Sequence, residues 1–209
     1  MIVPLIPVKA DRDGRLYCGK ISFEDGRPKV FDEMDYLEAI SSMTSSAENK
    51  RPVVVMDVKG LNERGMNIDL LKNLKIRGSR VMFMTYIRTV DDVLDAFNTD
   101  ADSVIMPVQT VKDGYEMDCI LEISDSVIPL LLVKERRTVF NRMKKEPLWA
   151  LRELEKKGFR RFIVMDTDGD LELNDWKDLS GYEVLPYSES ITDEEFSSIG
   201  MNDVLRCLL

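Results

Sequence analysis

The chain alternates short apolar runs with amphipathic segments, and this alternation is the strongest constraint on its fold. The apolar runs are rich in Val, Ile and Leu almost throughout, which is typical of strands buried on both faces. Strands that alternate with helices pair in parallel through right-handed crossovers. The eight expected strands are 1–8, 52–58, 80–87, 102–108, 126–133, 161–166, 182–186 and 203–209.

Helical patterns fill the intervals between these runs. Thr89 with Asp92, and Thr192 with Glu195, have the spacing of a capping box, and Gly158 stands where a helix ends in a left-handed glycine. The expected helices are 34–43, 67–76, 89–97, 115–123, 147–158 and 191–200.

Eight strand–helix units predict an α/β fold, a (βα)8 TIM barrel formed by one domain over residues 1–209. This length is close to the lower limit of about 200 residues for that fold. An open, doubly wound sheet is the competing architecture.

One string occurs twice and favours the barrel. The sequence reads VMDVKG at 55–60 and VMDTDG at 164–169, and the segments that follow each copy are also similar. Two fused half-barrels, at about 1–110 and 111–209, would leave such an internal repeat. The alternative is a chance similarity between buried strands.

Two features fit a barrel less well. Pro7 and Pro129 fall inside expected strands, where a bulge or a strand end must absorb the missing N–H. The sequence also ends directly after the eighth strand, so we expect the last helix to be missing. The resulting apolar seam would be covered by segment 10–32, by a second copy of the chain or by a protein partner.

Charge and composition restrict the partners. The net charge is −9, which argues against nucleic acid, and no apolar run is long enough to span a membrane. The start of the chain lacks the pattern of a signal peptide, and the three cysteines have no paired spacing. We therefore expect a cytoplasmic protein with reduced thiols.

The sequence contains few of the side-chain patterns that bind metal ions. The chain has no histidine, which removes histidine bases and most transition-metal sites. Asp166, Asp168 and Asp170 alternate as in a calcium loop, but Leu171 and Lys177 replace the glycine and the final acid that such a loop needs. We expect neither a metal nor a cofactor.

Several stretches resemble one enzyme family. IVPLIPVKADRDGR, VVVMDVKGL, YIRTVDDVLDAF with DADSVIM, and FIVMDTDGD are similar, in order, to motifs of the HisA/HisF barrels of histidine biosynthesis. That family comprises the phosphoribosyl-aminoimidazole-carboxamide isomerase and the imidazole glycerol phosphate synthase cyclase. The resemblance implies a barrel of two half-barrel repeats that binds a substrate through its phosphates.

The functional positions of that family are changed in this chain. The aspartates that act as acid and base align with Pro7 and Leu132, so neither isomerase nor cyclase activity is expected. The isomerase threonine aligns with Met165, and the cyclase lysine aligns with Cys18, close to Lys20. The phosphate-binding glycines align with Met84, Thr85, Tyr86, Pro107, Ser188, Glu189 and Cys207.

Charged residues nevertheless remain at the carboxyl ends of the strands, where barrel sites lie. Lys9, Lys59 and Lys134 could form an anion site there, or one of them could form a Schiff base. The alternative is that they are solvated loop lysines.

Asp57 and Asp166 occupy equivalent positions of the repeat. They could form a carboxylate pair, of which one acts as an acid. Alternatively, each caps its own loop through backbone N–H groups. We take Lys9, Asp57, Lys134 and Asp166 as catalytic candidates and Lys59, Arg88, Gln109, Asp168 and Ser188 as ligand-binding candidates.

Two functions follow from these residues. The first is a repurposed isomerase- or lyase-type enzyme that acts on a small anionic metabolite, such as a phosphosugar. The second is a non-catalytic binding or partner subunit that retains only the scaffold.

Overall fold

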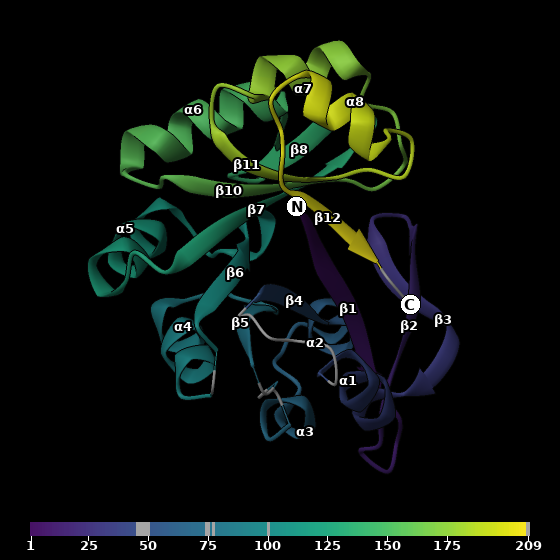
Figure 1. Ribbon diagram of the computed structural model, residues 1–209. Helices are drawn as coiled ribbons and strands as arrows, with labels where there is room; N and C mark the ends of the chain where they lie inside the picture. Colours follow the sequence, from purple (N-terminus) through teal and green to yellow (C-terminus); the bar gives the residue numbers. More distant parts are fainter. Residues whose placement is uncertain (45–50, 74–75, 77, 100, 208–209) are drawn as a thin grey trace.

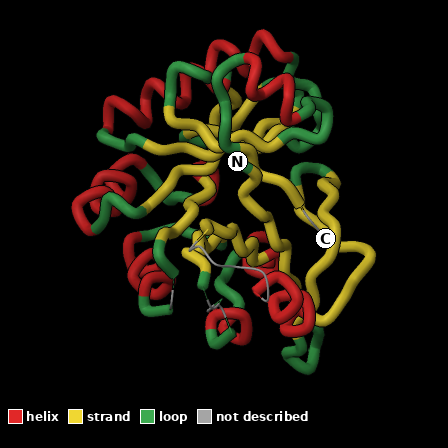
Figure 2. The backbone as a smooth tube through the Cα atoms, viewed as in Figure 1, coloured by secondary structure: helices red, strands yellow, loops and turns green. Residues whose placement is uncertain are grey.

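A computed structural model describes residues 1–44, 51–73, 76, 78–99 and 101–207. The fold is a mixed α/β arrangement. Twelve strands of the described chain belong to one sheet, and most of the helices lie outside the strands (Figure 2). No helix within the described ranges is long and apolar enough to cross a membrane.

Eight parallel strands form the centre of the sheet, and all eight were predicted. Their hydrogen-bonded order is β12-β1-β4-β5-β6-β7-β10-β11 (Figure 1). The strands are β1 (Ile2–Ala10), β4 (Arg51–Asp57), β5 (Ser79–Met84), β6 (Ser103–Pro107), β7 (Val127–Lys134), β10 (Arg161–Asp166), β11 (Glu183–Tyr187) and β12 (Val204–Cys207).

The sheet is not closed by hydrogen bonds, because no ladder joins β11 to β12 within the described residues. Arg206 of β12 spans this interval. Its guanidinium donates to the Ser188 carbonyl oxygen, to Ile191 O at 2.6 Å and to Asp193 Oδ1 at 2.8 Å. Side-chain contacts therefore connect the two end strands where backbone pairing is absent.

The helices largely follow the predicted positions. α1 (Tyr36–Thr44), α4 (Val90–Phe97), α5 (Gly114–Ile123), α6 (Pro147–Lys157) and α8 (Asp193–Ser198) were expected. α3 (Ile68–Leu71) covers the start of the predicted helix 67–76, of which residues 74 and 75 lie outside the described ranges. The short helices α2 (Val58–Glu63), α7 (Leu173–Leu179) and η1 (Val108–Thr110) were not predicted.

The predicted helix ends are confirmed. Thr89 and Thr192 each begin a helix with a capping box, completed by Asp92 and Glu195. Gly158 ends α6 with φ +117°, a left-handed conformation that glycine adopts without a Cβ clash.

Two antiparallel hairpins were missed by the sequence analysis. β2 (Leu16–Glu24) and β3 (Arg27–Asp35) follow β1, and β8 (Arg137–Phe140) and β9 (Met143–Lys145) follow β7. Each hairpin therefore follows the first strand of a half of the chain. The order strand, hairpin, helix, strand therefore occurs twice along the chain.

The two prolines need no bulge. On one side of β1, Pro7 pairs with Met56 of β4. On the other side, β12 pairs with residues 2–5 and β2 pairs with residues 8–10, so Pro7 lies between these two ladders. Pro129 pairs with Met106 of β6 and precedes Leu130, where the ladder with β10 begins. Each proline thus lacks a strand partner on one side, so its missing N–H is tolerated there.

The expected apolar seam is small. Val204 and Leu205 of β12 are buried, whereas Ile2 on β1 is 45% exposed. Segment 10–32 contributes β2 and much of β3, and β2 pairs with β1 beyond the end of β12. This segment therefore covers part of the edge that the prediction left open.

Two apolar clusters form the core. One lies between the strands and the helices, and the other is enclosed by the strands themselves. Met56, Met84 and Met165 belong to the enclosed cluster, as expected for core-filling methionines. Phe23 and Val30 of the first hairpin and Leu61 of α2 also pack against it. Apolar side chains of the hairpin thus pack against the cluster that the strands enclose.

Candidate functional site

Asp57, at the end of β4, is buried and fully engaged. Its Oδ1 accepts a hydrogen bond from Gly60 N at 2.8 Å, and its Oδ2 accepts from Asn67 N and from Thr85 Oγ1, each at 2.9 Å. Burial raises the pKa of this carboxyl group, and the hydrogen bonds from Gly60 and Asn67 oppose the shift.

Asp166, at the end of β10, has an equivalent environment. Its Oδ1 accepts from the N–H groups of Gly169 at 3.1 Å and Asp170 at 3.2 Å. Its Oδ2 accepts from Leu171 N at 3.2 Å and from Ser188 Oγ at 3.1 Å. Burial raises the pKa of Asp166 to about 6 against opposing hydrogen bonds, and the Asp168 carboxylate adds to the increase.

The two aspartates therefore act as loop caps. Each binds backbone N–H groups of its own loop and a hydroxyl that directly follows the next strand, Thr85 after β5 and Ser188 after β11. Four donors occupy the lone-pair sites of the Asp166 carboxylate. These contacts match the loop-cap alternative, and a catalytic role for either residue stays a prediction.

Two of the three candidate lysines face carboxylates of the first hairpin. Lys9 forms an ion pair with Glu33 of β3, and Lys134 Nζ lies 3.2 Å from Asp25 Oδ1 in the turn between β2 and β3. Lys59 lies on α2, half-buried, where its charge lowers the pKa of Asp57. Lys9 and Lys134 thus bind the hairpin and do not stand free at an anion site.

The hairpin leaves little space beneath it. Phe23 meets the ring of Tyr187 edge to face, with centroids 6.3 Å apart. The cavity between Phe23 and the strand ends measures only about 70 Å³ and has mostly apolar walls, including Met56, Leu61 and Leu132. We call it the inner chamber. A metabolite-sized ligand needs about 300 Å³ or more.

A larger cavity lies beside the inner chamber, where loops follow β5 and β6. It measures about 880 Å³. We call it the arginine cavity because three arginines and a lysine line it. Its lining residues are Arg64, Gly65, Tyr86, Arg88, Asp92, Val108, Gln109, Thr110, Val111, Lys112, Asp113, Gly114, Asn141 and Arg142.

The carboxylates of this cavity are committed to helix caps. Asp92 accepts from the backbone N–H of Arg88 at 2.8 Å and of Thr89 at 2.9 Å. Asp113 accepts from Glu116 N at 3.0 Å. Lys112 Nζ lies 3.7 Å from Glu116 Oε1.

The arginines of this cavity have no acidic partner. Across the described chain, no carboxylate lies at ion-pair distance from the guanidinium groups of Arg64, Arg88 or Arg142. The cavity thus has unpaired positive charge although the chain as a whole is acidic.

Three of the seven non-glycine residues that have positive φ in the described chain line this cavity. Arg64, Asn141 and Arg142 have φ values of 62°, 47° and 65°, in the left-handed region that glycine normally occupies. Non-glycine residues in this region cluster at functional sites, because the surrounding structure must hold them there. Asn141 and Arg142 form the two-residue turn between β8 and β9, which brings Arg142 to the cavity.

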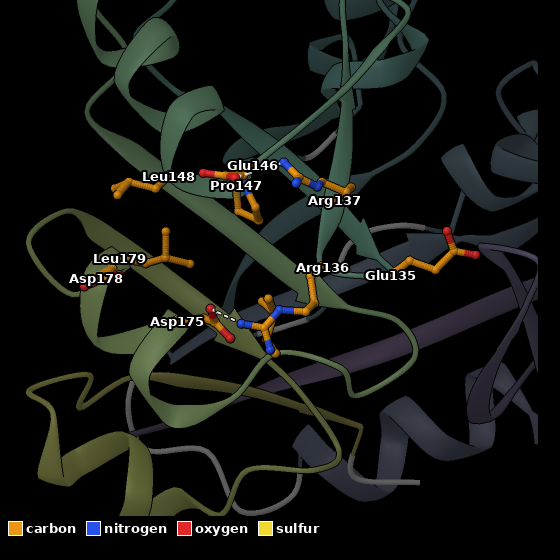
Figure 3. Close-up of a pocket in the computed structure, with 10 residues that line it drawn as sticks. Glu135, Arg136, Arg137, Glu146, Pro147, Leu148, Asp175, Asp178 and Leu179 are labelled. Atoms are coloured by element: carbon orange, nitrogen blue, oxygen red, sulfur yellow. Dashed lines mark hydrogen bonds and ion pairs between the residues drawn. The ribbon is translucent and has the colours of Figure 1, made fainter.

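A third cavity, of about 410 Å³, differs because its charges are already paired (Figure 3). Arg136 points to Asp175, with 2.6 Å between Nη2 and Oδ1, and Arg137 Nη1 lies 3.1 Å from Glu146 Oε1. The internal ion pairs leave no free cation for a ligand.

A fourth cavity, also of about 410 Å³, is acidic. Asp166, Asp168, Tyr187 and Glu189 line it. Asp168 Oδ2 accepts from Glu135 N at 2.7 Å, and Tyr187 Oη donates to Glu189 Oε1 at 2.9 Å. Within the ranges that the structure describes, no group of three or more acidic or cysteine side chains is arranged to hold a metal ion.

The candidate residues divide among these places. Arg88 and Gln109 share the arginine cavity, and Asp166, Asp168 and Ser188 form one network near the acidic cavity. Asp57 and Lys59 form a separate group at the end of β4. The sequence analysis missed Arg64, Lys112 and Arg142, because three different loops bring them together. A sequence signal exists only for Arg142, where an Asn-Arg pair between two β-prone stretches could have indicated a turn.

No protein-family model matches the chain, and a search of curated proteins finds no match.

Proposed function

We propose that this chain binds a small anionic metabolite, with a phosphate or carboxylate group, in the arginine cavity. The observation that carries the proposal is the set of guanidinium groups without acidic partners around a cavity of about 880 Å³. Guanidinium groups bind phosphate and carboxylate in a bidentate manner, and such charge-assisted hydrogen bonds are about twice as strong as neutral ones.

The proposed architecture behind this site is a (βα)8 barrel, without a β11–β12 ladder in the described residues, made of two half-barrel repeats and related to the HisA/HisF enzymes. The sequential order of the eight parallel strands supports it, as do the repeated hairpins and the matching environments of Asp57 and Asp166. The cavity lies at loops after the third and fourth parallel strands, one of the places where that family binds phosphate.

We further propose that binding here proceeds without the acid–base chemistry of that family. The aligned aspartate positions hold Pro7, which is buried, and Leu132, which packs in the enclosed cluster. Neither side chain can transfer a proton. The chain is then a binding or partner subunit that retains the scaffold and one anion site.

The second candidate is an isomerase- or lyase-type enzyme acting on the same kind of ligand. Asp166 favours it, since a pKa of about 6 suits proton transfer near neutral pH. The four hydrogen bonds to its carboxylate weigh against it. Turnover of a phosphosugar that is lost in Asp166→Asn would support this candidate.

Thermal unfolding in the presence of inorganic phosphate tests the binding proposal. A ligand that binds only the folded protein raises Tm by an amount set by its concentration relative to Kd. We expect phosphate to raise Tm at low ionic strength, and Arg88→Ala to reduce the affinity for phosphate about tenfold or more.

Arg160→Ala is the matched control, because Arg160 is exposed and does not line the arginine cavity. This variant should respond to phosphate as the wild type does. The proposal is wrong if neither phosphate nor a carboxylate such as lactate raises Tm, or if Arg88→Ala and Arg160→Ala weaken binding equally.

A further inference from the structure

The arginine cavity and the inner chamber are neighbours that share a wall. Gln109 and Thr110 line both of them. Thr110 is fixed, since its hydroxyl donates to Pro107 O at 2.8 Å and to Ile87 O at 2.5 Å. Gln109 is the other residue of this wall.

The Gln109 amide is poorly satisfied. Its Oε1 is buried and has no hydrogen-bond partner in the described structure. A buried polar atom without a partner is unfavourable, and one beside a cavity is usually satisfied by a ligand or a water. A rotation of this side chain would both relieve the unpaired atom and join the two cavities.

The inner chamber is small and mainly apolar. Phe23, Met56, Leu61, Met84, Leu130 and Leu132 contribute its apolar walls. Asn62, which also lines it, donates its amide to Pro28 O at 2.9 Å. At roughly 30 Å³ for each group of the size of a water or methylene, a volume of about 70 Å³ accepts two to three such groups.

We propose that the anion bound in the arginine cavity has a short aliphatic tail, of two to three carbons, that passes Gln109 and occupies the inner chamber. This inference rests on the proposed function, since the anionic group is held by the arginines. It adds the class of ligand: a short-chain alkyl ester of phosphate or a short-chain aliphatic acid. Polar sugars would fit the chamber less well than an alkyl group, because most of its lining is apolar and its polar side chains are only Arg27, Asn62, Gln109 and Thr110.

A homologous series of phosphates tests this inference on the wild-type protein. The probes are inorganic phosphate and methyl, ethyl, n-propyl and n-hexyl phosphate, with Kd measured by calorimetry. Each buried methylene should tighten binding about fourfold. We expect Kd to fall from phosphate to ethyl or propyl phosphate and to rise again for hexyl phosphate, which exceeds the chamber.

Leu61→Phe tests the location of the tail, because the larger side chain fills the inner chamber. The affinity gain from ethyl phosphate over inorganic phosphate should then disappear. Leu94→Phe is the matched control: Leu94 is exposed on α4 and lines neither cavity, so this variant should keep the gain. If Leu61→Phe does not fold, Leu132→Phe replaces it.

The outcomes separate the two proposals. If inorganic phosphate binds but no alkyl group improves its affinity, the tail inference is overturned and the anion site stands. The same conclusion follows if Leu61→Phe retains the full gain. If neither these phosphates nor lactate binds, the proposed function fails as well.

Discussion

At the scale of single residues, Asp57 and Asp166 show how a buried charge can serve a loop. Each carboxylate is removed from water, and backbone N–H groups replace the lost hydration. The duplicated string VMDxxG encodes this arrangement, because the aspartate caps the loop that begins at that string. The similar strings therefore predicted similar backbone contacts for the two aspartates. They did not reveal that the hydroxyl groups of Thr85 and Ser188 would also donate to these carboxylates.

Asp166→Asn should flatten the pH dependence of stability. The folded carboxyl group has a pKa of about 6 against an ordinary value of 3.8, so the neutral form is favoured by folding. That stabilisation is present at low pH and is lost as the pH rises from about 3.8 to about 6. The loss in free energy of unfolding is about 3 kcal/mol. Asparagine does not ionise, so the variant lacks this loss.

Urea denaturation of both proteins at pH 4 and pH 7 measures the effect. At pH 4 the variant should be less stable by about 1–3 kcal/mol, because its amide NH₂ faces backbone donors. The deficit should shrink by pH 7. Asp95→Asn, on the exposed face of α4, should follow the wild-type curve. An unchanged difference between pH 4 and pH 7 would contradict the assignment.

At the scale of elements, the first hairpin is held mainly by apolar contacts. Its ion pairs, Lys9 with Glu33 and Lys134 with Asp25, are partly exposed. Exposed ion pairs contribute about 0–1 kcal/mol each. Phe23 packs on the enclosed cluster and on Tyr187, which is the larger contribution.

Phe23→Ala should therefore lower the free energy of unfolding by about 2–3 kcal/mol, somewhat less than for a fully buried phenylalanine. Lys134→Ala should lower it by less than 1 kcal/mol. Chemical denaturation at neutral pH compares the two variants directly. Equal losses would mean that charge, and not apolar packing, holds the hairpin in place.

The hairpins also show where sequence patterns stop being informative. The eight parallel strands are buried on both faces and appear as apolar runs, so their positions were predictable. β3 reads RPKVFDEMD, with a bulge beside Asp32, and most of its side chains are exposed. An exposed edge strand with a bulge has neither an apolar run nor strict alternation, so no periodicity revealed it.

The arginine cavity could not be predicted from the sequence for a related reason. Arg88 and Gln109 were identified because they follow predicted strands. Arg64 follows α2, which was not predicted, and Arg142 lies in a hairpin turn that was not predicted either. A site assembled from several loops depends on loop conformation, which local sequence determines weakly.

At the scale of the whole molecule, Arg206 joins β12 to the segment that follows β11 through hydrogen bonds. Arg206 reaches Ser188 and Ile191 in the segment that follows β11 and Asp193 at the start of α8, and its guanidinium lies 5.7 Å from the centre of the Phe196 ring. No ladder replaces these contacts within the described residues.

Arg206→Leu should lower the free energy of unfolding by about 2–4 kcal/mol, because carbonyl groups lose a charged donor. Amide hydrogen exchange of β12 should accelerate more than that of β4. Arg160→Leu, at an exposed position, should change stability by no more than about 0.5 kcal/mol. A uniform acceleration across all strands would indicate general destabilisation and contradict a local role.

The left-handed arginines place a limit on how stable this fold can become. Glycine would adopt the backbone of Arg64 and Arg142 with less strain, by about 1 kcal/mol or more at each position. Glycine would also remove both charges from the arginine cavity. If the arginine cavity binds an anion as proposed, these two positions exchange stability for charge, and selection for thermal resistance alone would favour glycine at both.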